Sequence, residues 1–180
     1  YVALTYQFMA LDVPYKGAVL LEKAMRDGLV ETTEKNLAIL GSAYQRSQEY
    51  EKASPVLERA AELSSEGNAY SRLANVYLNL NENEKALAAA RAALQKGKLK
   101  RQDLAWMNRG SAEAALHCYK DAEKSFAKAA KFEKIKKSAN NWKKYVQLEG
   151  ERRRVGPVAA LGAHGVEQTA LAERKEARLF

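Results

Sequence analysis

The sequence predicts an all-α solenoid of antiparallel helix pairs, and three observations support this prediction. Ala, Leu, Glu and Lys are abundant, and only three prolines occur in 180 residues, a composition that favours helices. Within residues 36–61, apolar or small residues recur three and four apart in two successive runs, the spacing of one helical face. One short helix pair cannot bury both of its apolar faces, so it needs similar neighbours, and similar segments lie on both sides.

The segment 36–61 is the most regular unit. Its helices are marked by Leu37, Leu40, Gly41 and Tyr44, and then by Tyr50, Ala53, Leu57 and Ala60. The small residues are expected where the two helices approach closely, with Tyr44 and Leu57 filling the space beside them. Four units are predicted at about 1–30, 33–65, 67–98 and 101–134.

The first unit has a predicted break between its helices at residues 12–14. Pro14 suits the first turn of a helix, where its missing N–H costs nothing, and Gly28 suits the end of that helix. Thr32 and Thr33 then predict the N-cap of the next unit. The chain opens on Tyr1 inside an apolar-periodic segment, so we expect a fragment or a processed product, with any signal sequence or anchor outside the sequence.

The later units repeat the pattern with two departures. Ala53, Ala86 and Ala122 are equivalent, at separations of 33 and 36 residues, and Gly17 takes the same place in the first unit. The residue nine positions earlier is aromatic in the first three units: Phe8, Tyr44 and Tyr77. In the fourth unit that position is Glu113, and Arg109 replaces an expected Leu. The fourth unit is therefore the least regular.

A capping helix is predicted at 135–154. Trp142, Val146 and Leu148 among many Lys and Arg indicate one apolar side that packs on the last repeat, while the other side faces water. Residues 155–180 are predicted to form a Gly/Ala linker and a short helix, a segment through which the protein could self-associate.

The repeat spacing resembles the tetratricopeptide repeat, TPR, across about residues 1–130. The match runs through Leu37, Leu40, Gly41, Tyr44, Ala53, Leu57 and Ala60, and through their counterparts in the other units. The resemblance implies a right-handed superhelix whose first helices line a concave, partner-binding groove. The groove residues that it implies are Tyr6, Lys35, Ser42, Gln45, Asn68, Ser71, Arg72, Asn75, Asn79, Met107 and Ser111.

The amides among these residues can pair with the backbone of an extended peptide, and Asn75 is the leading candidate contact. Polar residues on a solvated helix surface would give the same pattern. The carboxylate clamp of some chaperone-binding TPR proteins is matched only in part, by Lys35, Arg72 and Asn75, so a chaperone cofactor is not predicted.

A narrower resemblance joins Pro14–Lys23 and Lys35–Tyr44 to the C-terminal repeats of bacterial TPR proteins encoded beside TonB–ExbB–ExbD systems. It implies a periplasmic scaffold that assists TonB-dependent transport. A cytosolic peptide-binding adaptor is the first alternative.

Nothing in the sequence indicates catalysis, a cofactor or a metal. The two histidines and the single Cys118 form no known catalytic or ligand pattern, and adjacent His117 and Cys118 are expected to point in different directions. No apolar run is long enough to cross a membrane.

The net charge of +8 is uneven: residues 1–93 carry a net −2 and residues 94–180 a net +10. A basic nucleic-acid-associated protein is the second alternative. However, Lys120, Lys124, Lys128 and Lys131 lie three and four apart, as on one solvated helix face, so no nucleic-acid partner is expected.

Overall fold

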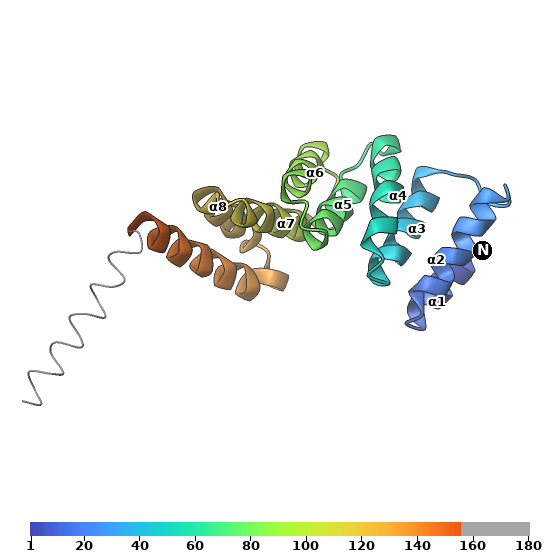
Figure 1. The fold of residues 1–180 in the computed structure, drawn as a ribbon, viewed down its shortest axis with the longest axis horizontal. Helices are drawn as coiled ribbons and strands as arrows, with labels where there is room; N and C mark the ends of the chain where they lie inside the picture. The colour runs from blue at the N-terminus through green and yellow to red at the C-terminus, as the bar shows by residue number, and fades with distance from the viewer. Residues whose placement is uncertain (156–180) are drawn as a thin grey trace, which may run out of the picture.

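The computed structural model of the protein describes residues 1–155, which fold into helices stacked in an elongated array (Figure 1). The helices are α1 (Val2–Ala10), α2 (Pro14–Arg26), α3 (Glu34–Arg46), α4 (Tyr50–Leu63), α5 (Asn68–Asn79), α6 (Asn83–Lys96), α7 (Gln102–Ala115) and α8 (Tyr119–Ala129). The short 3-10 helix η1 (Glu133–Ile135) leads into a long final helix, 136–155. The predicted linker and short helix after residue 155 lie outside the described residues, and Val155 itself still belongs to the final helix.

The helices pack as antiparallel pairs. The most extensive contacts join α3 to α4, α5 to α6 and α7 to α8. Contacts between successive pairs, α4 to α5 and α6 to α7, come next, followed by those of α1 with α2 and of α2 with α3. Each pair therefore covers its neighbour's apolar side. The predicted all-α array of helix pairs that ends in a C-terminal helix is confirmed.

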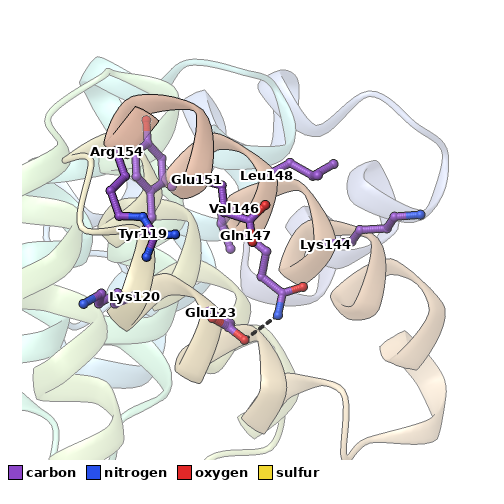
Figure 2. Close-up of a pocket in the computed structure, with 10 residues that line it drawn as sticks. Tyr119, Lys120, Glu123, Lys144, Val146, Gln147, Leu148, Glu151 and Arg154 are labelled. Carbon is purple, nitrogen blue, oxygen red and sulfur yellow. Dashed lines mark hydrogen bonds between the residues drawn. The ribbon is translucent and has the colours of Figure 1, made fainter. Parts of the chain in front are cut away.

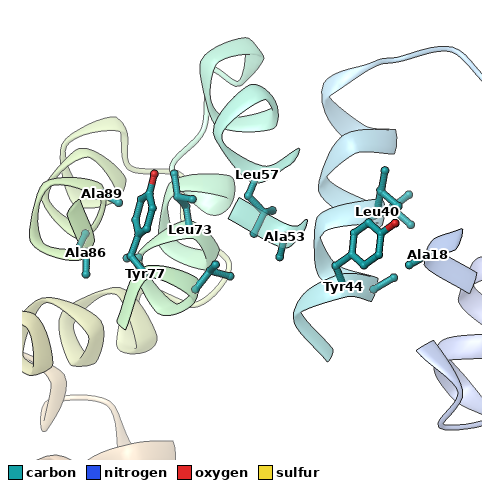
Figure 3. Packing of buried hydrophobic residues seen from close by; sticks show 14 of the residues in the cluster. Ala18, Leu40, Tyr44, Ala53, Leu57, Leu73, Tyr77, Ala86 and Ala89 are labelled. Carbon is teal, nitrogen blue, oxygen red and sulfur yellow. The ribbon is translucent and has the colours of Figure 1, made fainter. Parts of the chain in front are cut away.

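Small residues set the distance between paired helices. Ala53, Ala86 and Ala122 have no solvent exposure, as their equivalent positions predict. A Cβ on Gly41 would lie 2.5 Å from Cγ of Leu57, so the two helices meet where the sequence placed a small residue. Figure 3 shows the resulting core, in which Tyr44 and Tyr77 fill the spaces beside the alanines.

The turn inside each helix pair has the same backbone form. It contains one residue in the left-handed region: Asp12 (φ 59°), Gln48 (φ 61°), Asn81 (φ 59°) or His117 (φ 62°). The N–H of the following residue donates to the carbonyl of Phe8, Tyr44, Tyr77 or Glu113, at 2.8–3.0 Å. This bond satisfies a carbonyl near the end of the first helix. The first and fourth turns therefore match the two regular ones.

The predicted helix ends of the first two units are confirmed. Pro14 occupies the first turn of α2, and Gly28, with φ 72°, follows its C-cap. The side chain of Thr33 caps α3 by accepting from the backbone N–H of Asn36 at 3.3 Å.

The two residues at which the fourth unit departs from the repeat pattern, Arg109 and Glu113, form a buried ion pair. Arg109 Nε donates to Glu113 Oε1 at 2.8 Å, and Ser125 Oγ donates to Glu113 Oε2 at 2.6 Å. The Glu113 side chain is 1% exposed, so its carboxylate replaces the aromatic ring of the other units in the core. Arg109 and Lys128 also lie over the ring of Trp106.

The final helix packs on α8, but only part of its predicted apolar side is buried. Val146 is fully buried against Ala122 and Phe126, and Trp142 stacks on Phe126 at 6.0 Å while remaining 44% exposed. Leu148 is 56% exposed, so its assignment to the buried side was wrong. Two residues along a helix turn about 200°, which directs Leu148 away from the side defined by Val146.

Candidate functional site

The odd-numbered helices form the inner side of the array. α1 contacts α3, α3 contacts α5 and α5 contacts α7, whereas no comparable contact joins the even-numbered helices in the described chain. The odd-numbered helices therefore lie closer together than the even-numbered ones, which places them on the inside of the curve. We call the surface that they form the inner face.

A chain of amides crosses the inner face between α3 and α5. Gln45 Nε2 donates to Asn75 Oδ1 at 2.8 Å, joining residues thirty positions apart. One turn further along α5, Asn79 Nδ2 donates to the Asn75 carbonyl at 2.8 Å. Gln45 and Asn75 are half-buried and Asn79 is exposed. Their remaining donors and acceptors can bind peptide groups of a ligand.

Arg72 lies beside this chain and has only a neutral hydrogen-bond partner. Its Nη1 donates to Ser42 Oγ, which links α5 to α3 a second time. The surrounding atoms displace water from the guanidinium and lower the pKa of Arg72, an effect that the nearby Tyr6 of α1 opposes. No carboxylate of residues 1–155 forms a salt bridge with Arg72, and the residue as a whole is exposed to solvent.

A further inner-face residue, Asn108, is not among those that the sequence predicted. Its Nδ2 donates to the Ser71 carbonyl at 2.9 Å, and its side chain is buried. Asn108 therefore joins α7 to α5 through the backbone at Ser71. An uncharged polar residue in an Ala-rich helix was the feature of the sequence that could have indicated this inner-face position.

The other predicted contacts have different surroundings. Asn68 donates to the Lys98 carbonyl and accepts from the Lys100 N–H at 2.9 Å, so it fixes the loop before α7. Met107 packs against the cluster of Ala122, Phe126 and Val146. Lys35 is exposed in the first turn of α3, and Ser111 is half-buried in α7. The residues that the structure brings together are Tyr6, Ser42, Gln45, Arg72, Asn75 and Asn79.

A second depression, of about 530 Å³, lies between α8 and the final helix (Figure 2). Its lining mixes cations with carboxylates, and Gln147 Nε2 donates to Glu123 Oε1 across it at 2.5 Å. The depression is broad and open to water. It lacks the enclosed apolar walls that a small-molecule site requires.

The residues considered for catalysis are part of a turn. His117 is the left-handed residue between α7 and α8, where its Nδ1 lies 3.1 Å from Tyr119 Oη, and Cys118 is exposed. Within residues 1–155, no three His, Cys, Asp or Glu side chains gather as a metal site would require. None of the helices in that range is both long and apolar enough to cross a bilayer.

The lysines considered for nucleic-acid binding lie on the surface of α8 and just beyond it. Lys120, Lys124, Lys128 and Lys131 are all exposed. Lys124 pairs with Asp121 at 3.0 Å, and Lys128 lies over Trp106 at 4.2 Å from the ring centre. This arrangement is that of an exposed helix face, and the absence of a nucleic-acid partner stays a prediction.

Comparison with known proteins agrees with the repeat assignment. Residues 35–66 and 67–95 match the tetratricopeptide repeat. The described chain thus has the fold of a TPR array of helix pairs, as the sequence predicted. No curated protein sequence matches the chain significantly.

The array is similar to solved structures of MamA and of a kinesin light chain. A crystal structure of MamA is 27% identical and has a TM-score of 0.64, over 76% of this chain and 78% of that one. MamA from Desulfovibrio magneticus RS-1, from residue 41 to its end, is 14% identical with a TM-score of 0.71, and the match covers 93% of each chain. TPR-like repeats of a Podospora anserina protein described as a kinesin light chain are 13% identical, with a TM-score of 0.65 over 98% and 94% of the two chains.

Proposed function

We propose that this TPR scaffold binds an extended segment of a partner protein on its inner face, and that the segment places an acidic group on Arg72. The scaffold class follows from the repeat fold. The choice of face rests on the polar side chains that α1, α3 and α5 bring together there.

The amides suit a ligand that is recognised through its backbone. Asn75 and Asn79 each carry donors and acceptors, and their mutual bonds use only part of that capacity. An extended peptide has one N–H and one C=O per residue that seek such partners. The pair therefore can bind peptides of varied sequence.

The observation that carries the acidic preference is the environment of Arg72. A guanidinium has five donors in a planar fork that matches a carboxylate, and here it meets the Ser42 hydroxyl and no carboxylate of the described chain. An exposed guanidinium with a neutral partner keeps donors free for a bidentate, charge-assisted hydrogen bond to a carboxylate. An Asp, a Glu or a terminal carboxylate of the ligand can supply it.

Selection from a phage-displayed peptide library on the immobilised full chain tests this function. We expect enrichment of peptides that carry at least one acidic residue. The enriched peptides should bind Arg72→Ala about tenfold or more weakly than wild type, because a charge-assisted hydrogen bond is lost. Arg59→Ala is the matched control, since Arg59 is exposed on α4, outside the inner face. No enrichment, or equal binding to both variants, would contradict the proposal.

The narrower association with a TonB-type system, and the periplasmic location, rest on Pro14–Lys23 and Lys35–Tyr44 alone. The solved structures named above are MamA and kinesin light chain proteins and do not bear on it. A cytosolic adaptor has the same fold and differs in its compartment. Fractionation of cells that produce the natural precursor distinguishes them: recovery with the periplasmic fraction supports the first, and recovery with the cytosol the second.

A further inference from the structure

The second half of the final helix exposes apolar side chains. Tyr145 is 50% exposed, and Leu148 and Val155 are 56% and 58% exposed. Leu148 and Val155 lie on the side opposite Ala139 and Val146, which are fully buried on the array, and Tyr145 lies between the two sides. In Figure 1 this helix, in orange, is the last described element.

Cations lie among these apolar residues. Helix 136–155 contains seven Lys or Arg and only two Glu. One side of this helix carries, in chain order, Lys137, Lys144, Leu148, Arg152 and Val155, at successive spacings of seven, four, four and three residues. All five are exposed. We call these five residues, with Asn141 and Tyr145, the outer face.

We infer that the outer face binds the surface of an anionic lipid membrane. A helix whose exposed side combines Lys and Arg with aromatic and aliphatic residues lies in the headgroup region, where the cations meet lipid phosphates and the apolar side chains enter the acyl boundary. Tyr145 has an amphipathic ring that favours this depth. The inner face would stay open to its peptide ligand.

The shape and chemistry of the outer face favour a membrane over other anionic partners. The outer face borders the open depression beside α8, which Lys144 and Leu148 help to line, and a broad and deformable surface can follow this relief. Nucleic acid would use the cations and could stack on Tyr145, but it offers no apolar medium for Leu148 and Val155. Lipid satisfies both kinds of residue.

Co-sedimentation of the full chain with vesicles tests the inference. We expect the protein to sediment with vesicles of phosphatidylcholine and phosphatidylglycerol, and to remain in solution with vesicles of phosphatidylcholine alone. Added salt should weaken the binding, since the contacts with headgroups are screened. Equal behaviour with both kinds of vesicle would overturn the inference.

Two variants with matched controls locate the binding. Lys137→Glu/Lys144→Glu should weaken vesicle binding by at least about 25-fold, because each cation contributes roughly fivefold. Lys16→Glu/Lys124→Glu changes the net charge equally at exposed sites elsewhere and should retain most of the binding. Leu148→Asp should weaken binding about tenfold, while Leu63→Asp, at a comparably exposed leucine of α4, should not.

A parallel titration with a single-stranded oligonucleotide identifies the competing partner. One pair of results would overturn the lipid assignment. Oligonucleotide binding would depend on Lys137 and Lys144, and Leu148→Asp would change neither oligonucleotide binding nor vesicle binding. Circular dichroism of each variant confirms that the array remains folded. Loss of vesicle binding in the Leu63→Asp control to the same degree as in Leu148→Asp would also contradict the inference.

Discussion

Gln45 of α3 and Asn75 of α5 are joined by a hydrogen bond of 2.8 Å across the inner face. The bond holds the Asn75 amide in place before any ligand arrives, which reduces the conformational entropy lost on binding. It also links the polar side chains of two successive repeats. Preorganised amides beside an Arg without a carboxylate partner are the centre of the functional proposal.

Removing the two α5 amides should weaken peptide binding without unfolding the array. Asn75→Ala/Asn79→Ala deletes hydrogen-bonding groups that are half-buried or exposed, so the cost in stability is within about 1 kcal/mol. Capture of partner peptides should fall about tenfold or more, while helicity by circular dichroism is unchanged. Asn140→Ala/Asn141→Ala, on the final helix, is the control. Unchanged capture by the α5 variant would exclude these amides as contacts.

Breaking the buried ion pair of the fourth unit should destabilise the protein strongly. Glu113→Ala leaves the Arg109 guanidinium and the Ser125 hydroxyl without their acceptor, so we expect a loss of about 3 kcal/mol in the free energy of unfolding. Denaturant unfolding measures it.

A double variant with the apolar residues of the regular units provides the comparison for this loss of stability. Arg109→Leu/Glu113→Tyr places there the residue types of Leu40 and Tyr44 and should recover most of the stability. A double variant as unstable as Glu113→Ala would show that the site is not equivalent to the other cores.

The repeated turns predict a stabilising substitution. Gln48 has φ 61°, a conformation that costs a non-glycine residue free energy and costs glycine little. Gln48→Gly should therefore raise the free energy of unfolding by about 0.5–1 kcal/mol. The neighbouring Ser47, with φ −82°, gives the control: Ser47→Gly should destabilise. If both substitutions destabilise, relief of backbone strain is not the governing effect.

The start of α7 should confer pH-dependent stability. Hydrogen bonds from Arg101 lower the pKa of Asp103 below its usual value. Since the pKa is lower in the folded state, the bonds contribute stability above the unfolded pKa of about 3.9, and this stability is lost as the pH falls through the folded pKa. Urea unfolding of wild type and Arg101→Ala should show a difference near neutral pH that shrinks in acid. A difference that persists in acid would assign the effect to packing.

The sequence predicted the helix pairs well because their packing depends on local spacing. Ala53, Ala86 and Ala122 are fully buried, and Gly41 approaches Leu57 as a small residue should. These features follow from periods of three and four within one unit. The exposed position of Leu148 was missed because it was grouped with Val146, although two residues turn a helix by about 200° and so cannot share one side.

The inner face was predictable as a set of positions but not as a network. The hydrogen bonds Gln45–Asn75 and Arg72–Ser42 join residues thirty apart, and their formation depends on the angle between neighbouring repeats. For the same reason the resemblance placed Met107 on this face, while the structure packs it beneath the final helix. Glu113 was visible as a departure, but its partner Ser125 was not.

Chemical-shift mapping by ¹H–¹⁵N NMR tests the central claim most directly. Titration of the labelled full chain with a library-selected acidic peptide should shift the backbone amides around Ser42, Gln45, Arg72 and Asn75 most, with smaller shifts near Tyr6. Shifts confined to the even-numbered helices or to helix 136–155 would contradict the assignment of the inner face as the partner-binding surface.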